Sequence, residues 1–418
     1  MSIGYACMVI GEANTTISRC LLKSANDDTL RAMTHANLLA LEAMLDYNVR
    51  NSILLFRISS DIIPFGSHPA NTLYWQNEFN DVFNRLASKI KNAGMRVSMH
   101  PGQYTVLNSP TPQIVQNAVI DLKYHALFLD SLQTDACSKI ILHVGGVYQD
   151  KRTAMDTFMT HYEALPDNVK RRLVIENDDK NYSVEDVLDI SKHTQIPVVF
   201  DNLHHAIKPP IQNRTVDEWL DLCRQTWRVA DGKQKIHYSQ QKIGGMQSAH
   251  SNTIQVRAFM DFYNDLLDKS IDIMLEVKDK NLSAIKCIHA TQKKLPIRLL
   301  EQEWARYKYL VLSKSQASYG EIRNMLKHKA HVDVVRFYEI IEQALQLPEN
   351  KGAQINAAQH IWGYLNKHCT LAEKTRFIKL GRAYSEGTTT IQALKNHLFK
   401  CVNKQQVDYL IKSYYFII

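Results

Sequence analysis

The first 285 residues alternate between short apolar runs and longer amphipathic stretches. Several of the runs are almost continuously apolar, among them SILLF, KIILHV, RLVIE, IPVVFD and IMLEV. Such runs are typical of strands in a parallel sheet that is covered on both faces. The stretches between them, such as residues 77–92 and 113–132, space their apolar residues as amphipathic helices do.

This pattern predicts eight strands. They cover residues 3–9, 52–59, 96–100, 139–143, 172–176, 197–201, 235–238 and 272–276. Eight strand–helix units fit a (β/α)8 TIM barrel of the α/β class, and an open doubly wound sheet is the alternative. Neither GxGxxG nor GxxxxGK[ST] follows any of these strands, which leaves a nucleotide-cofactor site without support.

Beyond residue 286 only helical spacing remains. We expect a barrel domain over residues 1–292 and a smaller all-α domain over residues 297–418. Of the net charge of +8, residues 286–418 carry +11, from 21 Lys and Arg against 10 Asp and Glu, and the rest carries −3. A basic excess suggests contact with a polyanion such as DNA. A surface for a protein partner, or a merely solvated helical surface, explains the same charge.

The composition predicts a soluble, cytoplasmic protein. No run of about 18 apolar residues occurs, and the first residues lack the features of a signal peptide. The seven cysteines are scattered and never spaced as CxxC, which argues against a disulfide framework and against a thiolate zinc site. We expect a monomer without membrane contact.

Nearly every predicted strand ends on a histidine or a carboxylate. In a closed parallel barrel these ends lie on one rim, where residues far apart in sequence converge. The predicted ring consists of His100, His143, Glu176, Asp201, His204, His237 and Glu276. Unpaired buried charges are costly, and a divalent cation is a usual way to satisfy them. The pattern therefore predicts a metal centre.

The ligand types narrow the chemistry. Imidazole mixed with carboxylate, without thiolate, suits Mn, Zn or Fe better than a Ca or Mg site built of oxygens alone. This many ligands can hold two or three ions, and clustered ions roughly 3.5–4 Å apart activate water and stabilise the leaving oxygen of a phosphodiester. We favour phosphodiester hydrolysis. Isomerisation or epimerisation of a sugar uses the same kind of site and remains an alternative.

Eight segments, in order, resemble the UV damage endonuclease family (UvdE/UvsE). They are GYACM (4–8), FRISSDIIPFGSHP (56–69), SMHPGQY (98–104), ILHVGGVYQDK (141–151), IENDDKNYSVEDVL (175–188), VVFDNLHHA (198–206), KIHYS (235–239) and LEVKDK (275–280). The resemblance implies a TIM barrel related to endonuclease IV and xylose isomerase. It also implies two or three divalent ions, with Mn²⁺ expected and Zn²⁺, Co²⁺ or Mg²⁺ as alternatives.

The same resemblance implies a DNA repair endonuclease. Its substrate would be damaged double-stranded DNA, nicked immediately 5′ of pyrimidine dimers and 6-4 photoproducts, with abasic sites as a further candidate. An abasic-site endonuclease similar to endonuclease IV is the nearest alternative, and a DNA-binding module without catalytic activity is the non-enzymatic one.

The resemblance also implies roles for single residues. The family's metal-binding pattern falls on the seven ring residues, with His68 in addition, and Glu176 is expected to be catalytic. Lys235 matches a family lysine that can be carboxylated beside the metals, although a plain lysine at a strand start is equally consistent. His250 matches a histidine that would face the phosphate.

Residues on the predicted rim are candidates for DNA contact. Gln103 and Tyr104 follow the third strand, and the resemblance implies that they probe the lesion by wedging between or beside bases, joined by Tyr5. Arg57 and Lys278 are candidate phosphate contacts, and a structural ion pair is an equal expectation for Arg57. His205 is expected to be structural, because it points away from the ligands if its segment stays extended.

The helical part carries a second resemblance. WARYKYLVLSKS (304–315) and NAAQHIWGYL (356–365) resemble a YbgA-like helical domain of unknown function. His360, Trp362 and Tyr364 could form a site there, but a packed helical core is the stronger interpretation.

Overall fold

Eight parallel strands form the centre of the computed structural model, which describes residues 1–328 and 332–418. The strands are β1 (Ile3–Ala6), β2 (Leu55–Ile58), β3 (Arg96–Met99), β4 (Ile140–His143), β5 (Leu173–Glu176), β6 (Val198–Asp201), β7 (Lys235–Tyr238) and β8 (Asp272–Leu275). Each strand pairs with the next, and β8 pairs with β1, so that the barrel is closed. The predicted (β/α)8 fold is confirmed.

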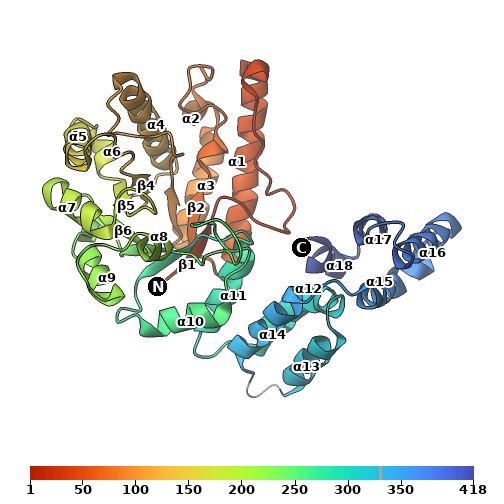
Figure 1. Cartoon of the computed structure of the whole chain (residues 1–418). Coiled ribbons are helices and arrows are strands. Elements are labelled where there is room, and N and C mark those ends of the chain that lie inside the picture. The colour runs from red at the N-terminus through yellow and green to blue at the C-terminus, as the bar shows by residue number, and fades with distance from the viewer. Residues whose placement is uncertain (329–331) are drawn as a thin grey trace. The chain divides into compact units, whose positions relative to one another are not determined.

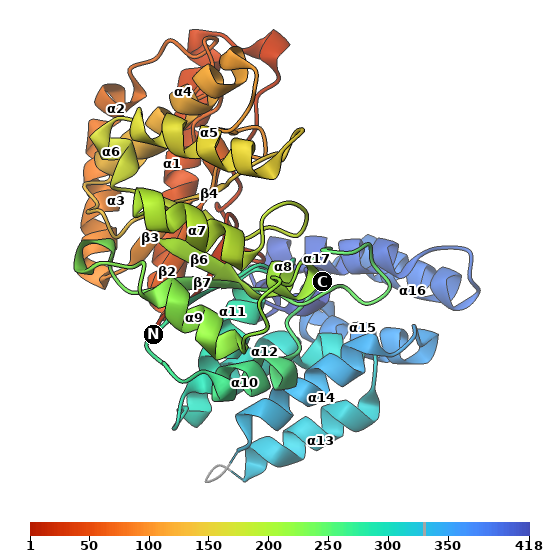
Figure 2. The same ribbon diagram turned by 60° about the vertical axis from the view of Figure 1, so that its left-hand side comes forward.

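Helices surround these strands (Figure 1, Figure 2). They are α1 (Asp27–Arg50), α2 (Trp75–Glu78), α3 (Asn80–Ala93), α4 (Pro112–Ser131), α5 (Lys151–Glu163), α6 (Asp167–Lys170), α7 (Val184–Thr194), α8 (Asn202–Ile207), α9 (Val216–Arg224), α10 (Val256–Asp265) and α11 (Asn281–Thr291). Helix α7 starts with a capping box: the side chain of Ser183 accepts from Asp186 N, and the carboxylate of Asp186 accepts from Ser183 N in return.

Backbone conformation explains where the strands differ from the predicted ranges. The first strand ends at Ala6 rather than Val9, because Cys7 has a φ of 74° and leaves the extended conformation. The second begins at Leu55, since Ser52, with a φ of 56°, lies in the turn before it. The predicted helix over residues 77–92 is divided at Phe79 into α2 and α3.

Part of the barrel interior below the rim is apolar. Ile141, Val174 and Val199 form a fully buried cluster, against which Trp227 packs. They lie two residues before the ends of β4, β5 and β6, so they share a strand face with the terminal residues. Below them, Arg96 stacks on the Trp227 ring at 5.3 Å and pairs with a carboxylate of β8. This packing fixes the strands whose ends form the rim.

Contacts between residues divide the chain into two compact units. The first comprises Met1–Ile254 with Phe262–Ile288, and the second comprises Gln255–Asp261 with His289–Ile418. The predicted domain ranges, 1–292 and 297–418, stay a prediction. Apart from the first turns of α10 and the end of α11, the second unit consists of α12 (Ile297–Leu312), α13 (Gln316–Lys327), α14 (Val334–Gln346), α15 (Lys351–Leu365), α16 (Leu371–Ser385), α17 (Ile391–Gln405) and α18 (Asp408–Ile411).

The second unit has its own apolar core. Helix α12 packs on α13, α14 and α15, and α17 packs on α15 and α16. Beside this core His289 is buried, and its Nδ1 lies 2.7 Å from the Tyr338 hydroxyl. Within residues 1–328 and 332–418, no helix combines the length and the apolar character that crossing a bilayer requires.

Candidate metal centre

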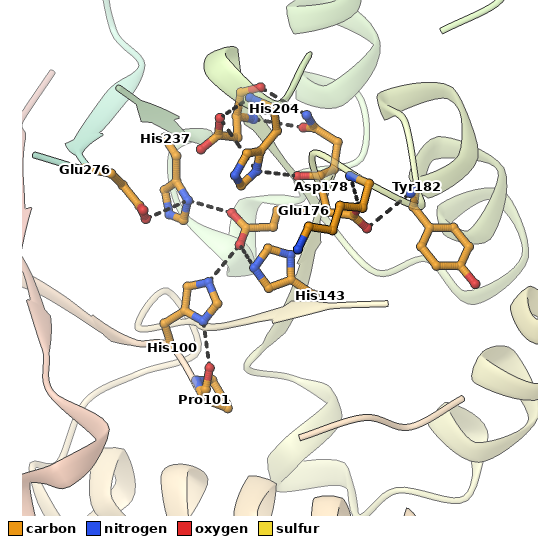
Figure 3. A network of polar contacts seen from close by, with 12 residues as sticks. His100, Pro101, His143, Glu176, Asp178, Tyr182, His204, His237 and Glu276 are labelled. Carbon is orange, nitrogen blue, oxygen red and sulfur yellow. Dashed lines mark hydrogen bonds and ion pairs between the residues drawn. The ribbon is translucent and has the colours of Figure 1, made fainter. Parts of the chain in front are cut away.

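Glu176 lies at the centre of the rim, where β5 ends. Its Oε1 is 2.7 Å from His100 Nε2 and 3.0 Å from His143 Nε2, while its Oε2 is 2.6 Å from His237 Nδ1 (Figure 3). The carboxylate is only 2% exposed. The ends of β3, β4, β5 and β7 thus each contribute one side chain to a single cluster, in which Glu176 and His237 are buried and His100 and His143 are partly exposed.

Asp201, His204 and Glu276 border this cluster. Asp201 ends β6, and its Oδ1 accepts from His204 N at 2.8 Å, which starts helix α8 and turns the His204 ring towards the rim. Glu276 directly follows β8, and its Oε1 lies 3.3 Å from His237 Nδ1. The same oxygen accepts from the Arg57 guanidinium at 2.5 Å. The seven predicted ring residues therefore lie on one rim.

Buried charge dominates the electrostatics of this cluster. Burial would raise the pKa of Glu176, but the surrounding imidazoles, that of His237 foremost, hold that pKa well below its ordinary range. Burial raises the pKa of Asp201 to about 6. Burial would lower the pKa of His204, yet the nearby carboxylates, with Asp201 foremost, raise it to about 9. The cluster is thus a place where a positive charge is stabilised.

The donor set fits a pair of divalent cations. Asp201 Oδ2, His143 Nδ1 and His237 Nε2 are buried and have no hydrogen-bond partner among the described residues. Two groups of three ligand atoms, one from His100, His143 and Glu176 and one from Glu176, Asp201 and His237, each lie within 4.8 Å of one another. A metal-binding site is therefore possible here, with Glu176 common to both groups.

Two asparagines that the sequence interpretation missed fix the strand ends. Asn177 Oδ1 accepts from Asp201 N at 2.9 Å, and its Nδ2 donates to Asp201 O at 3.0 Å. Asn202 binds both backbone groups of Ser239 in the same way, at 2.7 and 3.0 Å. Each side-chain amide thus continues the hydrogen bonding between two neighbouring strands beyond the point where their backbone pairing ends. The signal was present in the sequence, since each asparagine directly follows a predicted carboxylate ligand.

A second support holds the loops after β2 and β3. His125, buried in α4, places its Nε2 2.9 Å from Ser60 Oγ, and that hydroxyl donates to His100 O at 2.7 Å. Asp121, one turn earlier in α4, accepts from Thr105 Oγ1 at 2.7 Å. Both loops are therefore anchored to α4. The loop after β3 is held at His100 and at Thr105, so its two anchor points flank the exposed residues 102–104.

The remaining predicted residues differ in exposure. Gln103 and Tyr104 are exposed on the loop after β3, Tyr104 by 83%, and Lys278 is exposed as well. His250 is partly buried, with Nδ1 3.8 Å from Glu276 Oε2. Within the described part of the chain His68 belongs to neither ligand group, and its Nδ1 accepts from the backbone N of the residue two positions later.

Lys235 and Arg57 lie inside the barrel rather than at its surface. Lys235 is fully buried in β7, two residues before His237, and its Nζ has no hydrogen-bond partner in the described chain. Arg57 makes the ion pair with Glu276 that was one of its two predicted roles, and its side chain is 12% exposed.

Two predictions need correction. Tyr5, expected at the lesion, is fully buried, and its hydroxyl donates to Asn48 of α1 at 2.7 Å, because strand alternation turns it towards the helices. His205 was placed on an extended segment, but it lies in the helix α8 and packs on Phe200 and Trp219. Its structural role is consistent with these contacts, although the extended geometry was wrong.

The three residues of the possible site in the helical part do not form a common site: one packs against another ring and the other two are exposed. The Trp362 ring stacks on Phe377 at 4.3 Å, with an interplanar angle of 8°, and His360 is exposed. Tyr364 is 53% exposed, and its ring lies 6.0 Å from that of Tyr409.

Comparison with known proteins gives a consistent result. The family model of the UV-endonuclease UvdE matches residues 2–302, and that of a protein family of unknown function, DUF1722, matches residues 308–418. The UV DNA damage endonuclease of Clostridium perfringens (strain 13 / Type A) is 42% identical over 354 residues, which cover 84% of each chain. That of Bacillus cereus (strain Q1) is 33% identical over 271 residues, or 64% of this chain and 85% of the relative.

A solved structure agrees with these matches. The crystal structure of SacUVDE superimposes with a TM-score of 0.65 at 39% sequence identity, covering 69% of this chain and 96% of SacUVDE. The match with the Clostridium protein is longer than residues 2–302, so similarity continues into the helical part. The chain therefore belongs to the UvdE family of UV endonucleases.

Proposed function

We propose that this protein is a metal-dependent DNA repair endonuclease that cuts one strand immediately 5′ of a UV photoproduct. The observation that carries the proposal is Glu176, a fully buried carboxylate within 3.0 Å of imidazoles at the ends of three other strands, with the unpartnered atoms Asp201 Oδ2 and His237 Nε2 in the same cluster. UV DNA damage endonucleases among its relatives point to damaged DNA as the substrate.

The residues that would hold the ions are the two groups that share Glu176, with His204 and Glu276 beside them. Bound divalent ions, Mn²⁺ foremost, would supply a water of lowered pKa and would stabilise charge on the phosphodiester and on its leaving oxygen. The chain's own contribution is to hold these ligands rigidly, through the asparagine bridges at the ends of β5 and β6.

The DNA would lie across the rim. Gln103 and Tyr104 are free to stack on and hydrogen-bond to displaced nucleotides, because both are exposed while the loop around them is anchored to α4. Lys278 would contact a phosphate. His250, beside Glu276, would face the phosphate being cut. Arg57 would act through Glu276, which it orients.

Lys235 would be carboxylated. An unpartnered cation enclosed in the barrel is unfavourable, and burial lowers the pKa of Lys235. The neutral amine would add CO₂ at Nζ and release a proton to water, which leaves an anionic carbamate beside the residues that would hold the metals. Mass spectrometry of the intact protein under mild conditions would detect the added carboxyl group, and an unmodified lysine in active protein would contradict this part of the proposal.

Nicking of supercoiled plasmid tests the function as a whole. The protein, stripped of metal and reloaded with Mn²⁺, should relax UV-irradiated plasmid and leave unirradiated plasmid intact. A preference for depurinated plasmid would indicate an abasic-site endonuclease instead. Binding of irradiated DNA without cutting under all metal conditions would indicate a binding module, and turnover of a ketose without cutting would indicate a sugar epimerase.

A further inference from the structure

A hairpin over residues 240–251 follows β7 on the rim. Lys242 N donates to Ala249 O at 2.7 Å and Ser251 N donates to Gln240 O at 2.8 Å, with an antiparallel bridge between Gln241 and His250. The loop after β7 begins at the carboxyl end of a barrel strand, so its base lies on the same rim as the metal centre.

Hydrogen bonds also order the tip of this hairpin. The Gln241 amide donates to Met246 O at 2.8 Å and accepts from Ser248 N at 2.9 Å. Gly244, with a φ of 67°, supplies a left-handed position in the turn, which other residues adopt only with strain. The tip is therefore an ordered turn held by its own hydrogen bonds.

Those side chains are apolar and uncovered. Ile243 is 91% exposed and Met246 is 85% exposed. A single exposed apolar residue is ordinary, but two large ones on one rigid tip form a surface whose exposure to water is unfavourable. Packing within the first unit does not explain them. Lys242, beside them in the sequence, adds a positive charge to the tip.

The base of the hairpin adjoins the candidate ligands. His250 Nδ1 lies 3.8 Å from Glu276 Oε2, and Lys278 N donates to Ser251 O at 3.2 Å. His250 lies four positions after Met246 in the chain, which is at most roughly 14 Å of extended chain. Since base pairs in DNA rise by about 3.4 Å, the tip reaches within about four base pairs of a phosphate at the metal centre.

The hairpin also faces the predicted lesion-probing loop. In the closed order of the barrel, β7 and β3 are separated by three strands on either side, so the loops that follow them lie across the rim from each other. A duplex placed over the centre would be contacted from one side by Gln103 and Tyr104 and from the other by the hairpin tip.

We propose that Ile243 and Met246 form an apolar wedge that enters the base stack beside the lesion. The proposal rests on the proposed function, because it takes duplex DNA as the occupant of the rim. Apolar side chains that enter a base step unstack it and kink the duplex, which would open the damaged site for cutting. A surface of two side chains fits one base step, whereas a stable protein interface needs ~1,200 Å² or more.

The test compares two double variants with the wild type. Ile243→Ser with Met246→Ser removes the wedge, and Val229→Ser with Leu267→Ser is the matched control. Val229 and Leu267 are 101% and 85% exposed, but they lie in the segments that lead into β7 and β8, at the opposite end of the barrel. All four side chains are exposed, so each variant should fold and retain the wild-type metal content.

The measurements are affinity for a duplex with one photoproduct, and the fluorescence of a 2-aminopurine placed beside it. The wedge variant should bind at least roughly tenfold more weakly, since burial of one such side chain changes affinity by at least this factor. It should also lose the rise in fluorescence that reports unstacking. The control should match the wild type in both.

A duplex with mismatched pairs beside the lesion separates a wedge from a simple contact. Its bases are already unstacked, so the deficit of the wedge variant should shrink. An equal deficit on both duplexes, or a wedge variant that behaves like the control, would overturn the proposal. Failure of the wild type to cut would instead refute the proposed function, so the two failures are distinguishable.

Discussion

Replacing Glu176 by glutamine is the sharpest perturbation of the metal centre. The substitution keeps the shape of the side chain and one acceptor oxygen, but it removes the negative charge. It also turns the other oxygen into a donor, either beside His237 or beside His100 and His143, depending on the amide orientation. An amide cannot neutralise two cations as a shared carboxylate does.

The size of the effect follows from the burial of this carboxylate. Two unit charges 4 Å apart interact by roughly 4 kcal/mol at an effective dielectric constant of about 20, which suits a group that is only 2% exposed. At a factor of ten per 1.4 kcal/mol, that loss corresponds to a cutting rate lower by about three orders of magnitude. Affinity for damaged DNA should change far less, because Gln103, Tyr104 and Lys278 are untouched.

Single-turnover cutting of a duplex with one photoproduct measures this loss. Glu163→Gln is the matched control, since Glu163 is a carboxylate in α5 whose side chain is 62% exposed. Thermal unfolding and metal analysis of both variants would establish that the fold is intact and how much metal each holds. A Glu176→Gln variant that keeps more than about a tenth of the wild-type rate would refute the role given to Glu176.

Three further predictions concern recognition, charge and pH. Gln103→Ala with Tyr104→Ala should reduce the preference for damaged over intact duplex without changing metal content, as each lost stack costs ~1–3 kcal/mol; equal preference would place lesion sensing elsewhere. If the basic helical part contacts phosphates, Arg376→Gln with Lys379→Gln should flatten the slope of log affinity against log salt by up to about 1.8; an unchanged slope would favour a protein partner or a solvated surface. Burial lowers the pKa of His289 to about 4, so the stability it contributes is complete above its unfolded pKa of about 6.5 and falls as pH drops towards 4, by about 2 kcal/mol at pH 5. Chemical unfolding at pH 7 and pH 5 should therefore show a smaller difference for His289→Asn than for the wild type, and equal differences would contradict this assignment.

Hydrophobic pattern was sufficient to predict the barrel, because apolar runs of strand length alternate with amphipathic helices throughout the first unit. The convergence of His100, His143, Glu176 and His237 also followed from sequence, since each lies at or beside the end of a predicted strand. Closure of a parallel barrel then brings such ends together whatever their separation along the chain.

Other features depended on geometry that spacing does not encode. Tyr5 was misplaced because its role was taken from the family resemblance, and a matching segment does not say which face of the strand a side chain occupies. The role of Asn177 and Asn202 depends on side-chain amides that replace backbone pairing after a strand has ended. The sequence KIGGM (242–246) predicts only a loop, and it does not indicate that this loop forms the ordered apolar tip of a hairpin after β7.

Mapping the cut on a defined substrate is the most direct test of whether this protein is a metal-dependent endonuclease that cuts 5′ of a photoproduct. The substrate is an end-labelled duplex with one cyclobutane pyrimidine dimer, incubated with metal-free protein and with protein reloaded with Mn²⁺. We expect one product, cut at the phosphodiester immediately 5′ of the dimer, which appears only when metal is present and never on the undamaged duplex. A cut that persists in the metal-free protein, or that falls elsewhere on the strand, would contradict it.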